Sequence, residues 1–345
     1  FIANIAGGTI AMDTPPTGTL TGTPSNDLIL GLGGDDMLFP GLGNDVVDGG
    51  AGIDIVVYGG LKNAYSITHF GPHVTVSGPD GSDNLSNVEL LSFGDGYQMV
   101  PFSLDISALG PAALVPLLPI YGTDGGDFLT VGTNASFHPI DLGDGLDNLF
   151  LSQPGIQTYN LNLTNVEQVF AAGNGNGETV NLLNAQNGLY LGQSLYIDLG
   201  DFDFLPDTLN LADGGNTVRV ANVEMIHGGT GNDSITLNTS GGNGDLVNVT
   251  GGGGADSFDF GGYAHIHAVS FHYGSLADSP AGAGRDTING FDASLDTIDL
   301  TGLGIVTWDV SGGIFHAYLA GDMTPDLEIA LPGLIGTLNA GHVLI

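Results

Sequence analysis

Large apolar residues recur every nine positions between residues 22 and 57, and small or polar residues fill the intervals. The segment divides without interruption into the nonapeptides GTPSNDLIL (22–30), GLGGDDMLF (31–39), PGLGNDVVD (40–48) and GGAGIDIVV (49–57). The eighth place is apolar in every copy: Ile29, Leu38, Val47 and Val56. One inward side chain between two outward ones predicts a short β-strand after each glycine-rich turn. We therefore expect an all-β fold, a parallel β-roll or β-helix solenoid with flanking hairpins.

The sixth place of each nonapeptide is an aspartate: Asp27, Asp36, Asp45 and Asp54. Glycines allow the preceding turn to adopt positive φ and to bring carbonyl oxygens close to a cation. Carboxylate and carbonyl oxygens are the ligands that calcium prefers. With two nonapeptides per coil, Asp27 lies over Asp45 and Asp36 over Asp54, and neighbouring coils are ~4.8 Å apart. The sequence therefore predicts several calcium ions between stacked turns.

Calcium is also expected to be required for folding. Each repeat buries one aliphatic side chain, which is too little to offset the ordering of nine backbone residues. Stacked carboxylates repel one another, and a divalent cation reverses that repulsion. The alternative is a flexible linker rich in Gly and Asp, but a linker does not keep an apolar residue in register.

A second region carries a weaker repeat. Residues 140–182 parallel residues 197–237, which start 57 positions later, and the triplet Asn-Val-Glu occurs at 87–89, 165–167 and 222–224. Complete nonapeptides remain at GTDGGDFLT (122–130), GGTGNDSIT (228–236) and GGGGADSFD (251–259). These patterns predict a degenerate solenoid that contains an internal duplication.

The remaining segments complete a five-part organisation. YSITHF (65–70) and HVTVSG (73–78) alternate on either side of a Gly-Pro turn and predict a hairpin. The predicted domains are an apolar N-terminal arm or cap (1–21), a β-roll with a trailing β module (22–100), a Pro-rich apolar connector (101–120), the degenerate solenoid (121–284) and a C-terminal β module (285–345).

The charge balance excludes two classes of partner. The 345 residues include 38 acidic and 3 basic side chains, a net charge of −35, which disfavours nucleic acid and anionic membrane surfaces. The chain has no cysteine, so we expect bound metal rather than disulfide bonds to stabilise the fold. No run of 18 apolar residues is present, and we expect no membrane insertion. The chain starts at Phe1 and shows no N-terminal signal, which favours prior removal, processing or export through the other end.

The repeats at 22–57, the three Asn-Val-Glu triplets and the tail at 285–345 together resemble secreted bacterial RTX proteins. The tail is similar to the C-terminal module of serralysin-type proteases and other type I secretion substrates. The resemblance implies that the C-terminal region is the export signal and that extracellular calcium folds the chain. It also implies calcium ligands at the sixth-place aspartates and at neighbouring turn residues: Asp27, Asp36, Asp45, Asp54, Asp233, Asp256, Gly31, Gly33, Gly49, Asn26, Asn44 and Asp35.

Two departures from the repeat pattern put one of these sites in doubt. Asp35 stands at a fifth place that is usually Asn or a small residue, and Pro40 replaces a first-place glycine. We therefore expect distortion between the turns of 22–30 and 40–48.

The sequence predicts no enzyme, because H-E-x-x-H and G-x-S-x-G are absent and calcium already accounts for most acidic residues. No catalytic residue and no organic cofactor is expected. In a strand, His265 and His267 would share one face, so a transition-metal site with His272 competes with simple packing.

The function favoured by the sequence is that of a calcium-dependent, secreted structural protein. It would self-assemble at or beyond the cell surface as an S-layer-like sheet or a filament, with copies of itself as the main partner. An extracellular adhesin that binds surface glycans is the alternative, and a hydrolase fragment is a third. The arm at 1–12 either adds a strand to the next subunit or caps the first coil.

Overall fold

The computed structural model describes residues 10–12, 18–70, 73–100, 103–107, 118–133, 136–152, 156–171, 177–186, 194–200, 205–239, 246–263, 265–321 and 323–345. Most of the predicted arm (1–9 and 13–17) and of the predicted connector (101–102 and 108–117) lies outside these residues. The chain forms two compact units: unit 1 comprises 1–130 and 138–147, and unit 2 comprises 131–137 and 148–345. The predicted domain boundaries stay predictions.

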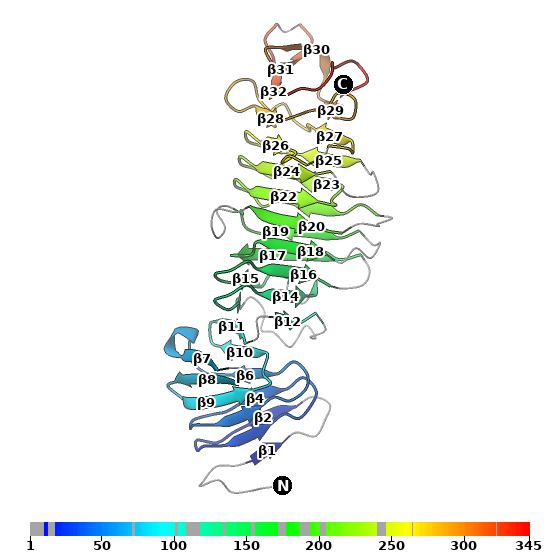
Figure 1. The fold of residues 1–345 in the computed structure, drawn as a ribbon. Coiled ribbons are helices and arrows are strands. Elements are labelled where there is room, and N and C mark those ends of the chain that lie inside the picture. Colours follow the sequence, from blue (N-terminus) through cyan, green and yellow to red (C-terminus); the bar gives the residue numbers. More distant parts are fainter. Residues whose placement is uncertain are drawn as a thin grey trace. The chain divides into compact units, whose positions relative to one another are not determined.

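Unit 1 begins as a parallel β-roll (Figure 1). Its elements are β1 (Ile10–Met12), β2 (Thr19–Thr21), β3 (Leu28–Leu30), β4 (Met37–Phe39), β5 (Val46–Asp48), β6 (Ile55–Val57), η1 (Lys62–Ala64), β7 (Ser66–Phe70), β8 (His73–Gly78), β9 (Gly81–Ser86), β10 (Leu90–Phe93), β11 (Gly96–Met99), β12 (Ser103–Asp105), β13 (Ile120–Tyr121), β14 (Phe128–Val131) and β15 (Pro139–Asp141). Val131, the last residue of β14, is counted in unit 2.

The β-roll has the predicted register. Strand β3 pairs in parallel with β5, with Ile29 opposite Val47, and β4 pairs in parallel with β6, with Leu38 opposite Val56. Consecutive strands therefore alternate between two sheets, and two nonapeptides complete one coil. The predicted all-β solenoid is confirmed.

An antiparallel excursion interrupts the β-roll after β6. Strands β7 and β8 form the predicted hairpin, and β8 pairs antiparallel with β9. The chain then returns to the two sheets, because β9 pairs in parallel with β5 and β10 in parallel with β6. The excursion thus adds residues between two coils without ending the stack.

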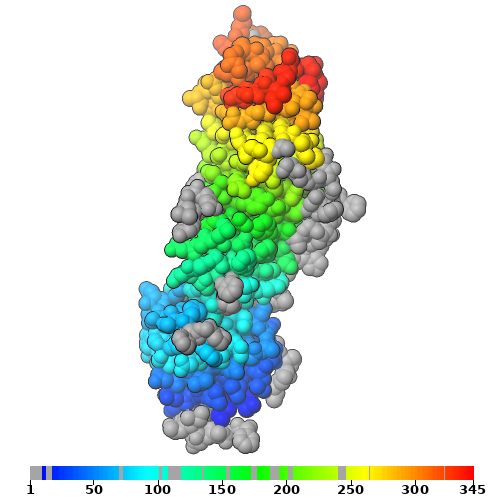
Figure 2. Space-filling model, in the orientation of Figure 1, coloured from blue at the N-terminus to red at the C-terminus, as the bar shows by residue number. Residues whose placement is uncertain are grey.

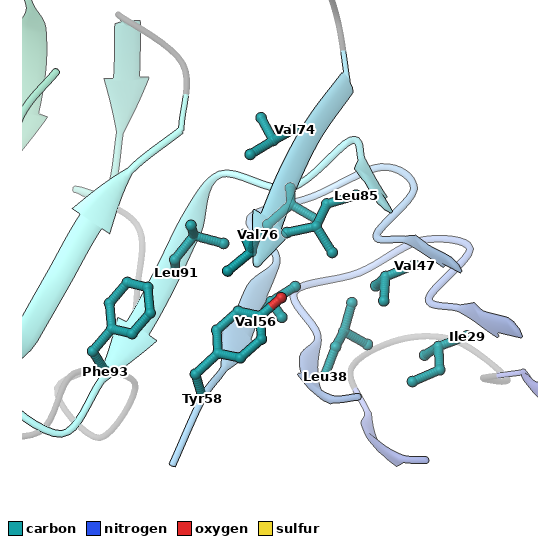
Figure 3. Packing of buried hydrophobic residues seen from close by; sticks show 11 residues of the cluster. Ile29, Leu38, Val47, Val56, Tyr58, Val74, Val76, Leu85, Leu91 and Phe93 are labelled. Atoms are coloured by element: carbon teal, nitrogen blue, oxygen red, sulfur yellow. The ribbon is translucent and has the colours of Figure 1, made fainter. Parts of the chain in front are cut away.

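The eighth-place side chains form the core of unit 1. Ile29, Leu38, Val47 and Val56 have no exposed surface. Figure 3 shows them together with Val76 of β8 and Leu85 of β9, while Tyr58 and Phe93 lie toward one end of the cluster. The rings of Tyr58 and Phe93 are stacked, with their centroids 5.6 Å apart. Aromatic residues that follow β6 and end β10 therefore enlarge a core that contains one aliphatic residue per repeat.

Unit 2 is a second parallel solenoid. Its strands are β16 (Asn148–Leu151), β17 (Thr158–Thr164), β18 (Gln168–Ala171), β19 (Thr179–Leu182), β20 (Leu195–Asp198), β21 (Thr208–Asn210), β22 (Thr217–Ala221), β23 (Met225–His227), β24 (Ser234–Asn238), β25 (Val247–Thr250), β26 (Ser257–Asp259), β27 (Val269–His272), β28 (Asp286–Ile288), β29 (Thr297–Asp299), β30 (Ile305–Ser311), β31 (Ile314–Leu319), β32 (Leu327–Ala330) and β33 (Val343–Leu344).

The strands of unit 2 divide between two sheets. One sheet has the order β16-β18-β20-β22-β24-β26-β28-β32-β31-β30, and the other has the order β17-β19-β21-β23-β25-β27-β29-β33. Buried residues stack from coil to coil, as in the column Val218, Ile235, Phe258 and Ile288. Successive coils lie directly on one another, so the colours of unit 2 follow the sequence in Figure 2. The last coils carry the antiparallel hairpin β30–β31.

The described residues contain no helix with the length and apolar character needed to cross a bilayer.

Candidate metal centre in the turns

The sixth-place aspartates of unit 1 form a hydrogen-bonded ladder. The backbone N–H of Asp27 donates to Oδ1 of Asp45, 2.7 Å away, and that of Asp36 donates to Oδ1 of Asp54, 2.9 Å away. These are the two stacked pairs that the sequence predicts. Each carboxylate thus supplies one oxygen to the backbone of the preceding coil. The other oxygen is left for a second partner.

The ladder continues beyond the nonapeptides. The N–H of Asp45 donates to Oδ1 of Asp83 at 2.9 Å, and the N–H of Asp54 donates to Oε2 of Glu89 at 2.8 Å. The antiparallel excursion separates these partners by 38 and 35 residues, so a nine-residue period does not find them. Asp83 and Glu89 are therefore ladder residues that the sequence reasoning missed.

The second oxygens of Asp45 and Asp54 are buried, and no hydrogen-bond donor reaches either one. Both residues have no exposed surface. A buried anionic oxygen without a donor costs several kcal/mol unless a cation neutralises it. These two oxygen atoms are therefore the strongest candidates for metal ligands.

The turn backbone brings further oxygens to the same place. A Cβ added to Gly31 would collide with the carbonyl oxygen of Gly49 and with Oδ2 of Asp36. A Cβ on Gly49 would likewise meet the carbonyl oxygen of Asn87 and Oδ2 of Asp54. Glycine is needed at these two first places because carbonyl and carboxylate oxygens crowd its Cα. These are hard oxygen donors of the type that calcium binds.

Positive φ is required elsewhere in the turn. Gly34, Gly43 and Gly52, all at the fourth place, have φ of +109°, +131° and +139°. Leu32, at the second place, takes φ of +73° although it is not glycine, and its side chain is exposed. The glycines thus fold the chain back on itself within a few residues, as a turn that wraps around an ion must do.

Burial shifts the titration of these carboxyls upward. Loss of solvent raises the pKa of Asp45 to about 6, while the N–H of Asp27 opposes the shift and the neighbouring carboxylate of Asp83 adds to it. Loss of solvent also raises the pKa of Asp54 to about 7, with the N–H of Asp36 opposing and Glu89 adding to the shift. Without a cation, the folded ladder holds protons that an exposed carboxylate would release.

Asp27 differs from the other predicted ligands. The N–H of Thr23 donates to its Oδ2 at 2.5 Å, and the Thr23 hydroxyl lies 3.0 Å from the same atom. The turn at 122–130 repeats this arrangement, since Thr123 donates to Asp127 from its N–H at 2.7 Å and from its hydroxyl at 2.8 Å. In both turns a second-place threonine supplies donors to the carboxylate. The regular Asp27–Asp45 step shows that Pro40 leaves the ladder bond intact.

In unit 2 the carboxylate ladder runs through Asp233, Asp256 and Asp286. The N–H of Asp233 donates to Oδ1 of Asp256 at 2.8 Å, and the N–H of Asp256 donates to Oδ1 of Asp286, also at 2.8 Å. The Asp286 N–H ends the series on the hydroxyl of Ser279 at 2.7 Å. The second oxygens of Asp233 and Asp256 are buried without a hydrogen-bond donor. Loss of solvent raises the pKa of both residues to about 6.

Two amide side chains occupy the preceding positions of the same ladder. The N–H of Gln186 donates to Oδ1 of Asn216 at 2.9 Å, and the N–H of Asn216 donates to Oδ1 of Asp233 at 2.7 Å. The Asn216 Nδ2 group donates to the carbonyls of Ala212 and Gly214, both at 2.9 Å. An NH₂ group thus lies among the turn carbonyls, where the carboxylate turns have an oxygen in need of a cation.

Gln186 makes a similar arrangement one step earlier in the ladder. Its Nε2 donates to the carbonyl oxygen of Asn184 at 2.9 Å and lies 3.2 Å from the Asn184 side-chain oxygen. In the turns at Gln186 and Asn216, side-chain NH₂ groups therefore donate hydrogen bonds to the turn oxygens. Their donors replace the cation that the carboxylate turns require.

The Asn-Val-Glu triplets now have a structural explanation. Asn87, Asn165 and Asn222 take φ near +50°, and the following valines are buried. The glutamate then serves as a ladder acceptor, as Glu89 does for Asp54 and Glu224 does for the N–H of Asp207 at 2.8 Å. The triplet makes a turn, a core contact and a ladder bond within three residues.

The fifth-place residues form an outer, exposed ladder. Oδ1 of Asn26 accepts the N–H of Asn44 at 2.9 Å, Oδ1 of Asn44 accepts the N–H of Ser82 at 2.9 Å, and Oδ1 of Asp35 accepts the N–H of Ile53 at 2.9 Å. Gly33 forms a parallel bridge with Ala51. These contacts position the turns, and the assignment of these residues as calcium ligands stays a prediction.

His265 and His267 do not share a strand face, because they precede β27 and lie outside any strand. His265 Nε2 is 2.9 Å from Oδ1 of Asp296, and His272 Nδ1 is 3.3 Å from Oδ2 of Asp299, so the histidines have separate partners. Within the described ranges, no three side chains of His, Asp or Glu are grouped to hold a metal.

A family model that covers the β-roll agrees with this chemistry. Residues 21–56 match the RTX calcium-binding nonapeptide repeat, in four copies. The chain is also similar to the crystal structure of the extracellular lipase LipA from Serratia marcescens, with 13% identity over 98% of this chain and a TM-score of 0.15. It spans 42% of that lipase chain. No curated protein matches. The predicted calcium cofactor is confirmed by the repeats, and the fold rests on the strands described above.

Proposed function

We propose that this calcium-binding RTX repeat protein is an extracellular structural protein that calcium folds after export and that associates with copies of itself. The buried second oxygens of Asp45, Asp54, Asp233 and Asp256 carry the proposal. Extracellular calcium modules bind at about 10⁻⁴–10⁻³ M, so a chain of this kind stays open in a low-calcium compartment and closes outside.

The acidic residues support a structural rather than a catalytic role. The buried carboxylates described above are engaged in ladder steps, each of which joins one coil to the next. A catalytic pair would instead converge on a cleft where a substrate binds. We propose that the function of the buried carboxylates is to hold the coils of the solenoid together.

The first strands of unit 1 offer surfaces for association. In the part of the chain that the structure describes, β1 pairs only with β3 and β2 only with β4. Among the described residues no second strand covers the outer edge of β1 or of β2, and such an edge is where another strand can add. Strand addition from a second copy would use main-chain hydrogen bonds, which the net charge of −35 does not oppose directly. Such head-to-tail contacts give a filament or an open lattice unless the rotation closes.

Sedimentation with and without chelator, combined with negative-stain microscopy, tests this function. We expect assemblies in millimolar calcium that disperse when calcium is removed, and smaller species when residues 1–12 are deleted. Particles that remain monomeric in calcium at high protein concentration would contradict self-association.

Export is tested separately. We propose that residues 285–345, which contain β28 to β33, carry the address for type I secretion. Deletion of this segment should retain the chain inside the producing cell, whereas deletion of 1–12 should leave export unchanged. Secretion of the 285–345 deletion at the normal level would refute the assignment.

A further inference from the structure

Unit 1 contains a cavity whose lining includes none of the ladder carboxylates. Its volume is about 720 Å³, within the range typical of small-ligand sites. Lys62 and Tyr65, from η1 and the turn that precedes β7, line it together with Tyr121 of β13 and Asp124 of the following turn. The excursion after β6 therefore creates a concave site that a plain β-roll lacks.

The walls of this cavity are held in place before any ligand arrives. The N–H of Lys62 donates to Oδ1 of Asp95 at 2.7 Å, and the Tyr65 hydroxyl donates to Oδ2 of Asp80 at 2.5 Å. The Tyr65 ring packs 5.1 Å from the ring of Phe93. The Gln98 side chain donates to the carbonyl oxygen of Gly122. Preorganised side chains of this kind reduce the entropy that binding would cost.

The polar lining combines one cation with several acceptors. Lys62 is the one lysine or arginine in the sequence of unit 1, and its Nζ lies 4.0 Å from the centre of the Tyr121 ring. Asp95, Asp124 and Asp141 also line the cavity. The site thus offers ammonium donors, carboxylate acceptors and two tyrosine rings within one space.

This combination selects among chemical classes of ligand. Three carboxylates and one ammonium group make the lining net negative, which repels an anion, and the charged lining disfavours an apolar molecule. A neutral polyhydroxyl ligand matches the site, because its hydroxyls can donate to carboxylates and accept from an ammonium group. Its C–H faces can lie on a tyrosine ring. We propose that this cavity binds a neutral saccharide of one or two sugar rings.

Saturation-transfer NMR on the full chain in millimolar calcium tests the proposal. The probes are neutral mono- and disaccharides of glucose, galactose, mannose and N-acetylglucosamine, with glucuronic acid and sialic acid as charged comparators. We expect transfer to at least one neutral sugar and none to the acidic ones. Absence of transfer to every neutral sugar, or equal transfer to the acidic sugars, would overturn the proposal.

Variants then locate the site. Asp124 is exposed at the third place of its turn, and Asp144 is exposed at the third place of the turn one coil later, outside the cavity lining. Asp124→Asn and Lys62→Gln should each weaken sugar binding at least about tenfold, since a hydrogen bond to a charged group contributes about 1.5–3 kcal/mol. The control Asp144→Asn should change affinity less than about twofold.

Circular dichroism in calcium would verify that each variant is folded. If Lys62→Gln does not fold, Asp124→Asn alone tests the proposal. Sugar binding that survives Asp124→Asn at full affinity would place the sugar elsewhere and overturn the assignment. The readout is independent of self-assembly, since soluble sugars report on this cavity whether or not the chain sediments as a polymer.

Discussion

The turn that contains Asp54 and the turn that contains Asn216 differ in what satisfies their oxygens. In both, a backbone N–H of one coil donates to a side-chain oxygen of the next. Beyond that bond, Asp54 has a buried oxygen without a donor, whereas Asn216 has an NH₂ group that donates to two carbonyls of its own turn. The ladder requires an acceptor at each step, but it does not require a charge.

The comparison indicates that the need for calcium is local to each turn. A carboxylate turn gathers oxygens and needs a cation near neutral pH, while an amide turn contains its own donors. Threonine turns lie between the two, because Thr23 and Thr123 donate to the carboxylates of Asp27 and Asp127. One solenoid can therefore contain turns with very different dependence on the ion.

The largest expected effect is that of removing calcium altogether. A chelator should abolish most of the β signal in circular dichroism, and calcium at about 10⁻⁴–10⁻³ M should restore it, because several carboxylate turns lose their counter-charge together. Magnesium is the matched control and should restore little, since it prefers six ligands in a tighter geometry. An identical spectrum with and without chelator would contradict the account.

A smaller effect on folding is expected from removing one ladder aspartate. Asp45→Ala deletes the acceptor for the Asp27 N–H as well as a metal oxygen, so the calcium concentration at the folding midpoint should rise several-fold. Asp105→Ala is the control, because Asp105 is exposed and accepts a local hydrogen bond from the N–H of Ser107. The two variants would be compared by calcium titration followed by circular dichroism. Equal midpoints would show that Asp45 contributes nothing specific.

Acid should partly replace calcium. Burial raises the pKa of Asp45 to about 6 and that of Asp54 to about 7, above the ordinary aspartate value of 3.8 that the unfolded chain retains. A raised pKa in the folded state means that stability from protonation is complete below pH 3.8 and is lost as pH rises through 6 and 7.

In chelator, lowering the pH from 8 to 5 should therefore increase folded structure, which urea titrations at each pH would measure. In saturating calcium the trend should reverse, because protons compete with the ion for the same oxygens. Calcium-free protein that loses stability between pH 8 and pH 5 would contradict the assignment of these buried carboxyls.

Much of the β-roll could be predicted because its period is local. The apolar eighth place and the acidic sixth place repeat every nine residues, so the register of β3 to β6 and the Asp27–Asp45 step follow from counting. Asp83 and Asp286 could not be found in this way. Excursions of variable length separate them from their partners, by 38 residues for Asp83 and by 30 for Asp286.

The amide turns and the cavity could not be predicted from the sequence for a different reason. Asn216 stands at the sixth place of LADGGNTVR (211–219), but only the structure shows its Nδ2 group among the carbonyls of Ala212 and Gly214. The cavity joins η1 to the turn after β13, and nothing in the nonapeptide pattern indicates that these segments meet.

The most direct test of the account is the number of calcium ions bound by a matched pair of variants, measured by equilibrium dialysis on folded protein. Asn216→Asp replaces the donating NH₂ group by an oxygen, and Asp54→Asn places an NH₂ group where an oxygen lacks a donor. The account predicts one additional ion for Asn216→Asp and one fewer for Asp54→Asn, relative to the unmodified chain. Identical stoichiometry in all three proteins would contradict the claim that each turn determines its own need for calcium.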